Sequence, residues 1–172
     1  MNRLIEPHNP EKSPVAIVEL ECLYQAGKQA TTFSAAKQEG IYASVQFIVK
    51  NPPGKVQVTA YGVVAVEFTF VLLDTFDNFL ASIQGIAGPG KYIPSRKKHR
   101  ANWVFELEGA FSQYHALCFP SQARLIDGDV WKCNKKECVD WANASIYEGG
   151  VRLTIDDVFP DGYAMGSATY EG

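Results

Sequence analysis

Residues 41–73 read IYASVQFIVKNPPGKVQVTAYGVVAVEFTFVLL, and this stretch decides the fold class. Apolar side chains recur at every second position on both sides of Asn51-Pro52-Pro53-Gly54, which is the pattern of half-buried β-strands. Two prolines followed by a glycine predict a turn between the strands. The stretch therefore predicts a long β-hairpin, with Gly62 marking a bulge or bend. The alternating residues include Val45, Phe47, Val49, Val64, Val66, Phe68, Phe70 and Leu72.

Further strands are predicted on both sides of this hairpin, wherever apolar and polar residues alternate. Asp127-Gly128 stands between two such runs and is a strong signal for a two-residue hairpin turn. In the first strand we expect one face to be made of Ala16, Val18, Leu20, Cys22 and Tyr24. The predicted segments are 15–24, 103–107, 123–133 and 151–155, with 163–170 as an edge strand or a tail.

One amphipathic helix is predicted directly after the hairpin, over residues 75–86. Thr75 is a suitable N-cap, apolar residues recur behind it at three- and four-residue spacing, and Gly85 and Gly88 supply an exit. A weaker helical stripe over residues 137–147 leaves that segment ambiguous. The stripe consists of Val139, Ala142 and Ile146.

These elements give about six to eight strands and one or two short helices, joined by hairpins instead of βαβ units. The chain has 172 residues, of which 47% are hydrophobic, and this is enough for one core. We therefore expect a single α+β domain over residues 15–172, mainly antiparallel β in an open barrel or sheet. Residues 1–14 hold three prolines and little apolar content, which predicts an extended N-terminal arm instead of a packed element.

Charge and composition narrow the class of protein. A net charge of −3 implies no global attraction to nucleic acid or membrane, so any such attraction must be local. The N-terminus has no apolar region typical of a secretory signal. The longest apolar stretch, residues 63–73, contains Glu67 and is too short to cross a bilayer of about 30 Å. Four scattered cysteines fit free thiols, so we expect a cytoplasmic protein without membrane contact.

The most distinctive feature is a basic loop over residues 88–103, within a segment rich in Gly, Pro, Lys and Arg. Five of the sixteen Lys and Arg residues fall in it, and no acidic residue lies between Asp77 and Glu106. Crowded cations repel one another unless an anion offsets them, and neighbouring aromatic rings can stack on bases. The alternative is a solvated loop that only maintains solubility. The candidate binding residues are Lys91, Tyr92, Arg96, Lys97, Lys98, Arg100 and Trp103.

A second pattern suits zinc. His115, Cys118, Cys133 and Cys138 supply one imidazole and three thiols, which can close a tetrahedral site. Residues three apart in a strand point to opposite faces, so His115 and Cys118 converge only if the chain turns between them. We favour the alternative, a buried Cys118 and a hydrogen-bonded or exposed His115, and expect neither metal nor any other cofactor.

Support for catalysis is small. No histidine stands beside a recognisable Ser or Cys nucleophile, and the glycines of residues 85–90 follow a predicted helix instead of opening one. Asp156, Asp157 and Asp161 can gather around a divalent cation, but Asp161-Gly162 reads better as an ordinary turn.

We therefore expect a non-enzymatic protein that binds an anionic partner through residues 88–103. Single-stranded nucleic acid or RNA is the first candidate, since phosphates attract cations and bases stack on aromatic rings. The alternative is an interaction module, such as an inhibitor or assembly subunit, that docks on an acidic protein surface. A small metal-dependent enzyme that uses the three aspartates comes third.

Overall fold

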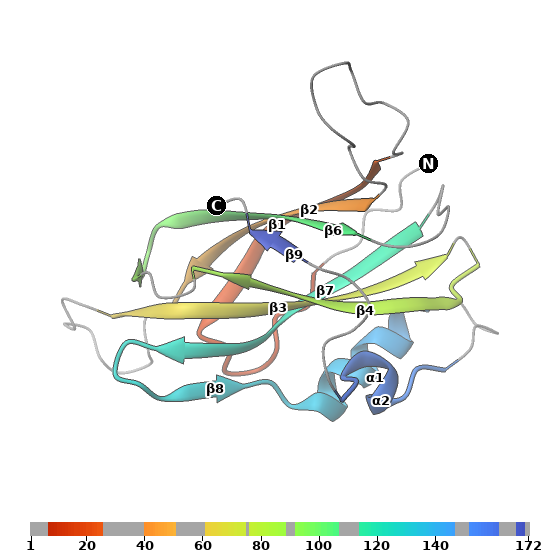
Figure 1. Ribbon diagram of the computed structural model, residues 1–172. Helices are drawn as coiled ribbons and strands as arrows, with labels where there is room; N and C mark the ends of the chain where they lie inside the picture. Colours follow the sequence, from red (N-terminus) through yellow and green to blue (C-terminus); the bar gives the residue numbers. More distant parts are fainter. Residues whose placement is uncertain are drawn as a thin grey trace, which may run out of the picture.

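Two antiparallel sheets packed face to face, with two short helices on the outer face of one of them, make up the fold (Figure 1). The computed structural model describes residues 7–25, 40–50, 61–74, 76–88, 92–106, 114–146, 152–161 and 168–170. The predicted class, mainly antiparallel β with one or two short helices, is confirmed. No helix among the described residues is long and apolar enough to cross a membrane.

The first sheet, called sheet A, has four strands in the order β1-β2-β6-β9. Strands far apart in the sequence lie side by side in this order, because β2 pairs with β6 across 50 to 66 positions. The predicted strands over 15–24, 41–50 and 103–107 all belong to this sheet. Its members are β1 (Val15–Gln25), β2 (Gly40–Val49), β6 (Lys98–Glu106) and β9 (Ala168–Tyr170).

The second sheet, called sheet B, has the order β4-β3-β7-β8, and the short strand β5 pairs with the start of β3. The predicted turn at Asp127-Gly128 joins β7 to β8, and Gly128 has a φ of 98°, which glycine adopts without strain. The members of sheet B are β3 (Gly62–Asp74), β4 (Phe79–Ala87), β5 (Ile93–Pro94), β7 (Tyr114–Leu125) and β8 (Val130–Lys132).

The main core lies between the two sheets and is rich in aromatic rings. Phe47 of sheet A meets Phe68 of sheet B with ring centroids 5.2 Å apart, and Phe70 meets Phe105 at 5.3 Å. These side chains occupy alternate positions of their strands, as predicted, because alternate residues of a strand face the same side. Each is almost fully buried, so the strand pattern of residues 41–73 correctly marked the core.

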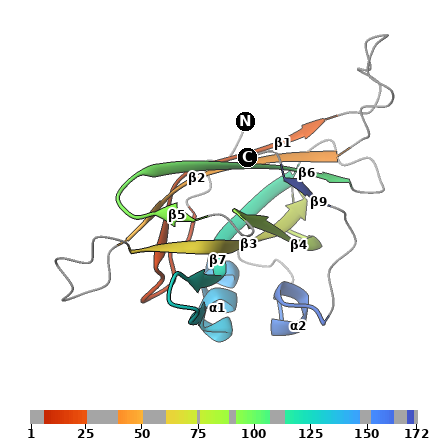
Figure 2. The same ribbon diagram turned by 60° about the vertical axis from the view of Figure 1, so that its left-hand side comes forward.

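A second, smaller core lies on the outer face of sheet B, beneath α1 (Lys135–Ser145) and α2 (Ile155–Val158). Figures 1 and 2 both show the helices on the side of sheet B that faces away from sheet A. Asn134 caps α1 by accepting a hydrogen bond from the Glu137 amide, and the predicted stripe of Val139, Ala142 and Ile146 is buried. Sheet B is therefore covered on both faces over part of its length.

The predicted hairpin between residues 41–50 and the strand that returns from residue 55 is wrong for the part of the chain that is described. Both edges of β2 are occupied, one by β1 and the other by β6, so β2 has no edge free for β3. The two strands lie in different sheets and meet through their side chains instead. The predicted turn at 51–54 and residues 55–60 lie outside the described residues.

The predicted helix over 75–86 is also wrong, because this segment turns back and forms β4 against β3. The Asp74 carboxylate accepts hydrogen bonds from the amides of Phe76 and Asn78, both at 2.8 Å, and this fixes a tight turn. Gly85 is not a helix exit. A Cβ there would lie 2.8 Å from the Trp103 ring, so only glycine lets the indole pack on β4.

Smaller corrections concern β1 and the C-terminal region. A β-bulge between Ile17 and Glu19 shifts the alternation, so Ile17 is buried while Val18, predicted to face inward, is 45% exposed. The strand predicted over 151–155 is absent from its described residues, where a capping box between Thr154 and Asp157 starts α2. Residues 168–170 form an edge strand, as one of the two expectations had it.

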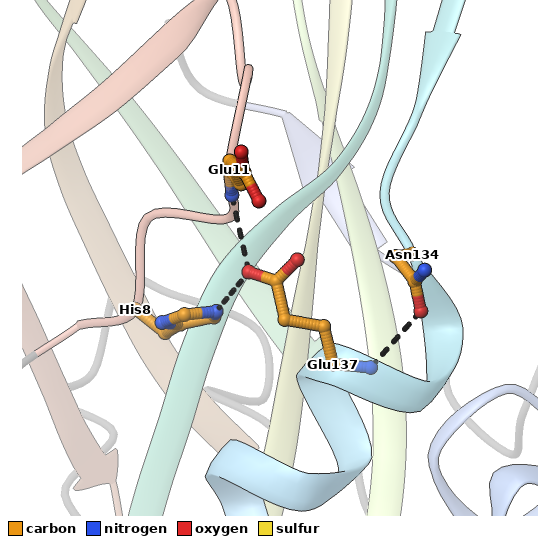
Figure 3. A network of polar contacts seen from close by, with 4 residues as sticks. All are labelled: His8, Glu11, Asn134 and Glu137. Carbon is orange, nitrogen blue, oxygen red and sulfur yellow. Dashed lines mark hydrogen bonds and ion pairs between the residues drawn. The ribbon is translucent and has the colours of Figure 1, made fainter.

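The N-terminal segment does not extend away from the domain over its described residues. The His8 amide donates to the Cys118 carbonyl at 3.0 Å, and Pro10, Ser13 and Pro14 are buried. Figure 3 shows the Glu137 carboxylate between the His8 ring and the Glu11 amide, at 3.2 and 3.1 Å. We call residues 7–14 the N-terminal strap, because they hold α1 against β7.

Replacing His8 with alanine is expected to lower the free energy of unfolding by about 1 kcal/mol. The substitution removes the hydrogen bond to Glu137 and the stacking of the imidazole on Trp141, whose ring centroid lies 4.9 Å away. Urea denaturation measures the change. Lys136→Ala is the matched control on the same helix, because its pair with Asp140 is exposed and contributes little. Equal losses in both variants would contradict the role given to the strap.

Candidate functional site

The predicted basic loop is partly strand. β5 covers Ile93–Pro94, a short turn follows, and Lys98 already begins β6. Because β5 belongs to sheet B and β6 to sheet A, the turn carries the chain from one sheet to the other, and Figure 2 shows it as the bend that joins them. We call residues 92–100 the basic segment. Lys91 lies outside the described residues.

The backbone of the basic segment is fixed to both sheets. The Ser95 amide donates to the Tyr61 carbonyl at 3.0 Å, and the Arg96 amide donates to the Val49 carbonyl at 3.1 Å. Arg96 has a φ of 69°, in the left-handed region that costs a non-glycine residue about 1 kcal/mol. The side chains of Arg96, Lys97 and Lys98 are exposed, so three cations project from the anchored turn and the first residue of β6.

Arg100, the fourth described cation, lies on the outer face of sheet A beside an acid. One of its nitrogens lies 3.7 Å from a Glu19 carboxylate oxygen, and another donates to the Ser44 hydroxyl at 2.8 Å. Both ionic side chains are about half exposed, so solvent weakens the pair. Arg100 is therefore partly neutralised by Glu19.

The two aromatic candidates, Tyr92 and Trp103, differ in their exposure to solvent. Tyr92 is 46% exposed, and its hydroxyl donates to the Tyr61 carbonyl at 3.3 Å. Trp103 is 1% exposed, packs between Phe68 and Phe70, and donates from its indole nitrogen to the Ile86 carbonyl at 3.1 Å. The stacking surface predicted for Trp103 is therefore wrong, because alternation along β6 turns this ring into the core.

The four residues of the predicted zinc pattern are not brought together. Cys118 belongs to the core between the sheets, whereas Cys138 belongs to the core under α1, on the other face of sheet B. Among the described residues, no three His, Cys, Asp or Glu side chains are grouped to hold a metal ion. Cys118 is fully buried, as the alternative expected, and burial raises the pKa of its thiol well above the usual value.

The three aspartates do not gather either. Asp157 is taken up by the capping box, where its carboxylate accepts a hydrogen bond from the Thr154 amide at 2.8 Å. Asp156 is exposed on the first turn of α2, and Asp161 lies beyond the end of that helix. The predicted carboxylate cluster is therefore contradicted for these residues.

A cleft that the sequence did not predict opens on the outer face of sheet B, with a volume of about 300 Å³. This volume lies at the lower end of the range for small-molecule sites. Side chains of β3, β4 and β7 form one wall, and the β8–α1 connection with residues 159–161 forms the other. Among its lining residues are Glu67, Gln84, Ser121, Lys132, Cys133 and Phe159.

Polar groups in the cleft are held in place by one another. The Glu67 carboxylate accepts from the Ser121 hydroxyl at 2.8 Å and from the side-chain Nε2 of Gln122 at 2.9 Å. Lys135 lies over the Phe159 ring, 5.4 Å from its centroid. One signal in the sequence could have indicated this site, since Glu67 interrupts the apolar run of residues 63–73.

Cys133 is the cysteine that lines the cleft. A hydrogen bond from the Cys138 thiol lowers the pKa of Cys133, and burial and the charges of Glu137 and Glu67 oppose that effect. The same hydrogen bond, with burial, raises the pKa of Cys138. Cys133 therefore ionises before its neighbour.

Comparison of the chain with protein-family models, curated proteins and solved structures finds no match.

Proposed function

We propose that this protein is a non-enzymatic binding module that contacts an anionic macromolecule through the basic segment. The observation that carries the proposal is the anchored turn with the start of β6, where Arg96, Lys97 and Lys98 are exposed while the turn backbone is hydrogen-bonded to Tyr61 and Val49. A fixed backbone lowers the entropic cost of holding three like charges together, and a bound anion offsets their repulsion.

Single-stranded nucleic acid is the first partner to test. Its phosphates suit lysine and arginine, and the exposed Tyr92 offers one ring on which a base can stack. Because Trp103 is buried, recognition rests on charge with one aromatic contact, and base-specific binding is not part of the proposal.

An acidic protein surface is the second candidate, and the pairing of Arg100 with Glu19 favours it. A face that presents both signs of charge complements another protein surface better than a uniformly negative backbone. If the partner is an acidic protein, oligonucleotides should not bind even at low salt. Tyr92→Ala and the salt dependence of oligonucleotide binding would then say nothing about the partner.

The test is the salt dependence of binding to fluorescent single-stranded DNA and RNA oligonucleotides, followed by anisotropy. Replacing Arg96, Lys97 and Lys98 with glutamine is expected to remove most of the binding. It should also reduce the slope of log affinity against log salt by about two, because each phosphate contact with a single strand contributes about 0.7. Tyr92→Ala is expected to weaken binding by about 1–3 kcal/mol with little change in Tm.

A charge-matched control replaces Lys12, Lys136 and Arg152 with glutamine. All three are exposed, and they lie on the N-terminal strap, on α1 and just before α2, so the net charge changes equally at a different place. An unchanged slope in the first variant, or equal losses in both, would overturn the proposal for nucleic acid. If the oligonucleotides do not bind even at about 50 mM salt, an acidic protein becomes the proposed partner instead of nucleic acid.

Arg96→Gly separates binding from stability. Glycine adopts the left-handed conformation without strain, so the variant is expected to be as stable as the parent or more stable by about 1 kcal/mol. Its affinity for the oligonucleotide should nevertheless fall, because one cation is lost from the turn. A variant that binds normally would show that Arg96 does not contact the partner.

A further inference from the structure

Two cysteine thiols meet at the start of α1. Asn134 is the N-cap, so Cys133 precedes the cap and Cys138 is the fourth residue of the helix. Residues at these two positions commonly pack against each other and fix the entry of the chain into the helix. Here both are cysteines, and the Cys138 thiol donates a hydrogen bond to the Cys133 sulfur.

The two sulfurs differ in access. Cys133 is half-buried and lines the cleft, whereas Cys138 is fully buried beneath α1. A thiolate at Cys133 is stabilised by the hydrogen bond from Cys138 and lies beside the N-terminus of the helix, where negative charge is favoured. A small molecule in the cleft therefore meets Cys133 first, and Cys138 is in place directly behind it.

The other two cysteines lack this arrangement. Cys118 is buried in the core between the sheets, and Cys22 lies half-buried on β1 against the same core. Neither lines the cleft, so these residues serve as internal controls for thiol reactivity.

The charges of the cleft indicate what kind of molecule fits. Lys132 and Lys135 supply cations, Glu67 and Asp161 supply carboxylates, and Gln84 and Gln122 supply amides. Cations bind carboxylates, carboxylates bind ammonium groups, and side-chain amides bind peptide groups. This set complements a zwitterionic, amino-acid-derived molecule better than an apolar or a purely anionic one.

We infer that Cys133 and Cys138 form a redox-active dithiol, and that it reacts stoichiometrically with a low-molecular-weight disulfide with amino-acid arms, of the cystine or glutathione class. This site is separate from the basic segment, and the inference does not depend on the proposed function.

The exchange takes place in two steps. The Cys133 thiolate attacks one sulfur of the small disulfide, the sulfur–sulfur bond of that molecule breaks, and its first half leaves as a thiolate that takes up a proton. Cys138 then loses its proton and attacks the Cys133 sulfur, which expels the second half as a thiol. The small disulfide gains two electrons and two protons, and the protein gains the Cys133–Cys138 disulfide.

The test uses the full chain, reduced and freed of reductant, then mixed with glutathione disulfide, quenched with a thiol-alkylating reagent and analysed by intact mass and peptide mapping. The parent protein should lose two alkylatable thiols and carry a Cys133–Cys138 disulfide without bound glutathione. Cys138→Ser should stop at one glutathionyl group on Cys133. Cys133→Ser should react at least about tenfold more slowly, because Cys118 and Cys138 are fully buried and Cys22 is half-buried.

Controls make each outcome decisive. Cys22→Ser should behave as the parent does, and Cys138→Ala repeats the trapping test if the serine variant does not fold. Reaction first at Cys22 or Cys118, or at Cys133 no faster than in the urea-unfolded chain, would overturn the inference. Stoichiometric zinc that is released when Cys133 is alkylated would also overturn it and assign the pair to a metal.

The substrate class has its own test. Replacing Lys132 and Lys135 with glutamine should slow the reaction with glutathione disulfide by roughly tenfold, since the cations attract its carboxylates. The rate with hydroxyethyl disulfide, which is uncharged, should stay unchanged. Equal rates of parent and variant with both reagents, or equal losses with both, would contradict recognition of amino-acid arms.

Discussion

Trp103→Ala is expected to lower the free energy of unfolding by about 3–5 kcal/mol, the range for removing a large buried aromatic ring. The ring is 1% exposed, and it fills the space between Phe68, Phe70 and the backbone at Gly85. Its loss leaves a cavity between the sheets and an Ile86 carbonyl without its indole donor. Urea denaturation followed by circular dichroism measures the effect.

Tyr92→Ala is the matched control, because it removes the other aromatic residue of the predicted basic loop. Tyr92 is 46% exposed, so its removal should change the stability by no more than about 0.5 kcal/mol. If the Trp103→Ala protein unfolds at the same urea concentration as the parent and binds oligonucleotides less tightly, Trp103 would be a stacking residue after all. That result would contradict its burial.

Raising the pH above about 9 is expected to destabilise the protein through Cys118, by up to about 1.4 kcal/mol for each pH unit. Burial raises the pKa of this thiol well above its value in the unfolded chain. Between the two pKa values the unfolded chain releases the proton and the folded chain keeps it, so alkali favours unfolding. The stabilising contribution is complete below the pKa of the unfolded thiol and is lost as the pH rises toward the folded one.

Cys118→Ala isolates this effect from the other groups that titrate in alkali. The variant is expected to be less stable than the parent at pH 7, because a buried sulfur is removed, but the difference should shrink as the pH rises from 9 to 11. Urea denaturation of both proteins from pH 7 to pH 11, in the presence of a phosphine reductant, measures it. Parallel stability curves for the two proteins would show that Cys118 ionises freely in the fold.

The sequence predicted strands best where burial on one face repeats at every second residue. Val45, Phe47 and Val49 were correctly assigned to a strand and to the core. The pairing partner of that strand was not predictable, because which strands become neighbours depends on side chains from both sheets. β2 pairs with β6, and the sequence between them gives no sign of this long-range choice.

The error over residues 75–86 has a specific cause. Phe79, Ile83 and Ile86 fall at helical spacing. However, residues four apart also share one face of a strand, and Ile83 and Ala87 both face the core from β4. Two contacts favour the strand over the helix: the turn at Asp74, whose carboxylate accepts hydrogen bonds from two backbone amides, and the fit of Gly85 against Trp103. Both contacts lie outside the range of a periodicity argument.

The candidate sites show the same division. The exposed cations at Arg96, Lys97 and Lys98 were predictable, because a run of like charges rarely enters a core. The cleft was not, since its walls come from β3, β4 and β7 on one side and from the start of α1 on the other. The sequence offered Cys133 only as a candidate zinc ligand, and its contact with Cys138 becomes apparent only once the N-cap at Asn134 is known.

The N-terminal strap sets an order on the assembly of the molecule during synthesis. His8 and Glu137 are 129 positions apart. At a synthesis rate of about 5–20 residues per second, Glu137 is therefore added to the chain roughly ten seconds after His8. In that interval β1 and β2 can already pair, whereas the strap has no helix to hold. The N-terminal strap is thus among the last segments to pack. The core on the outer face of sheet B stays exposed to water until α1 has been synthesised.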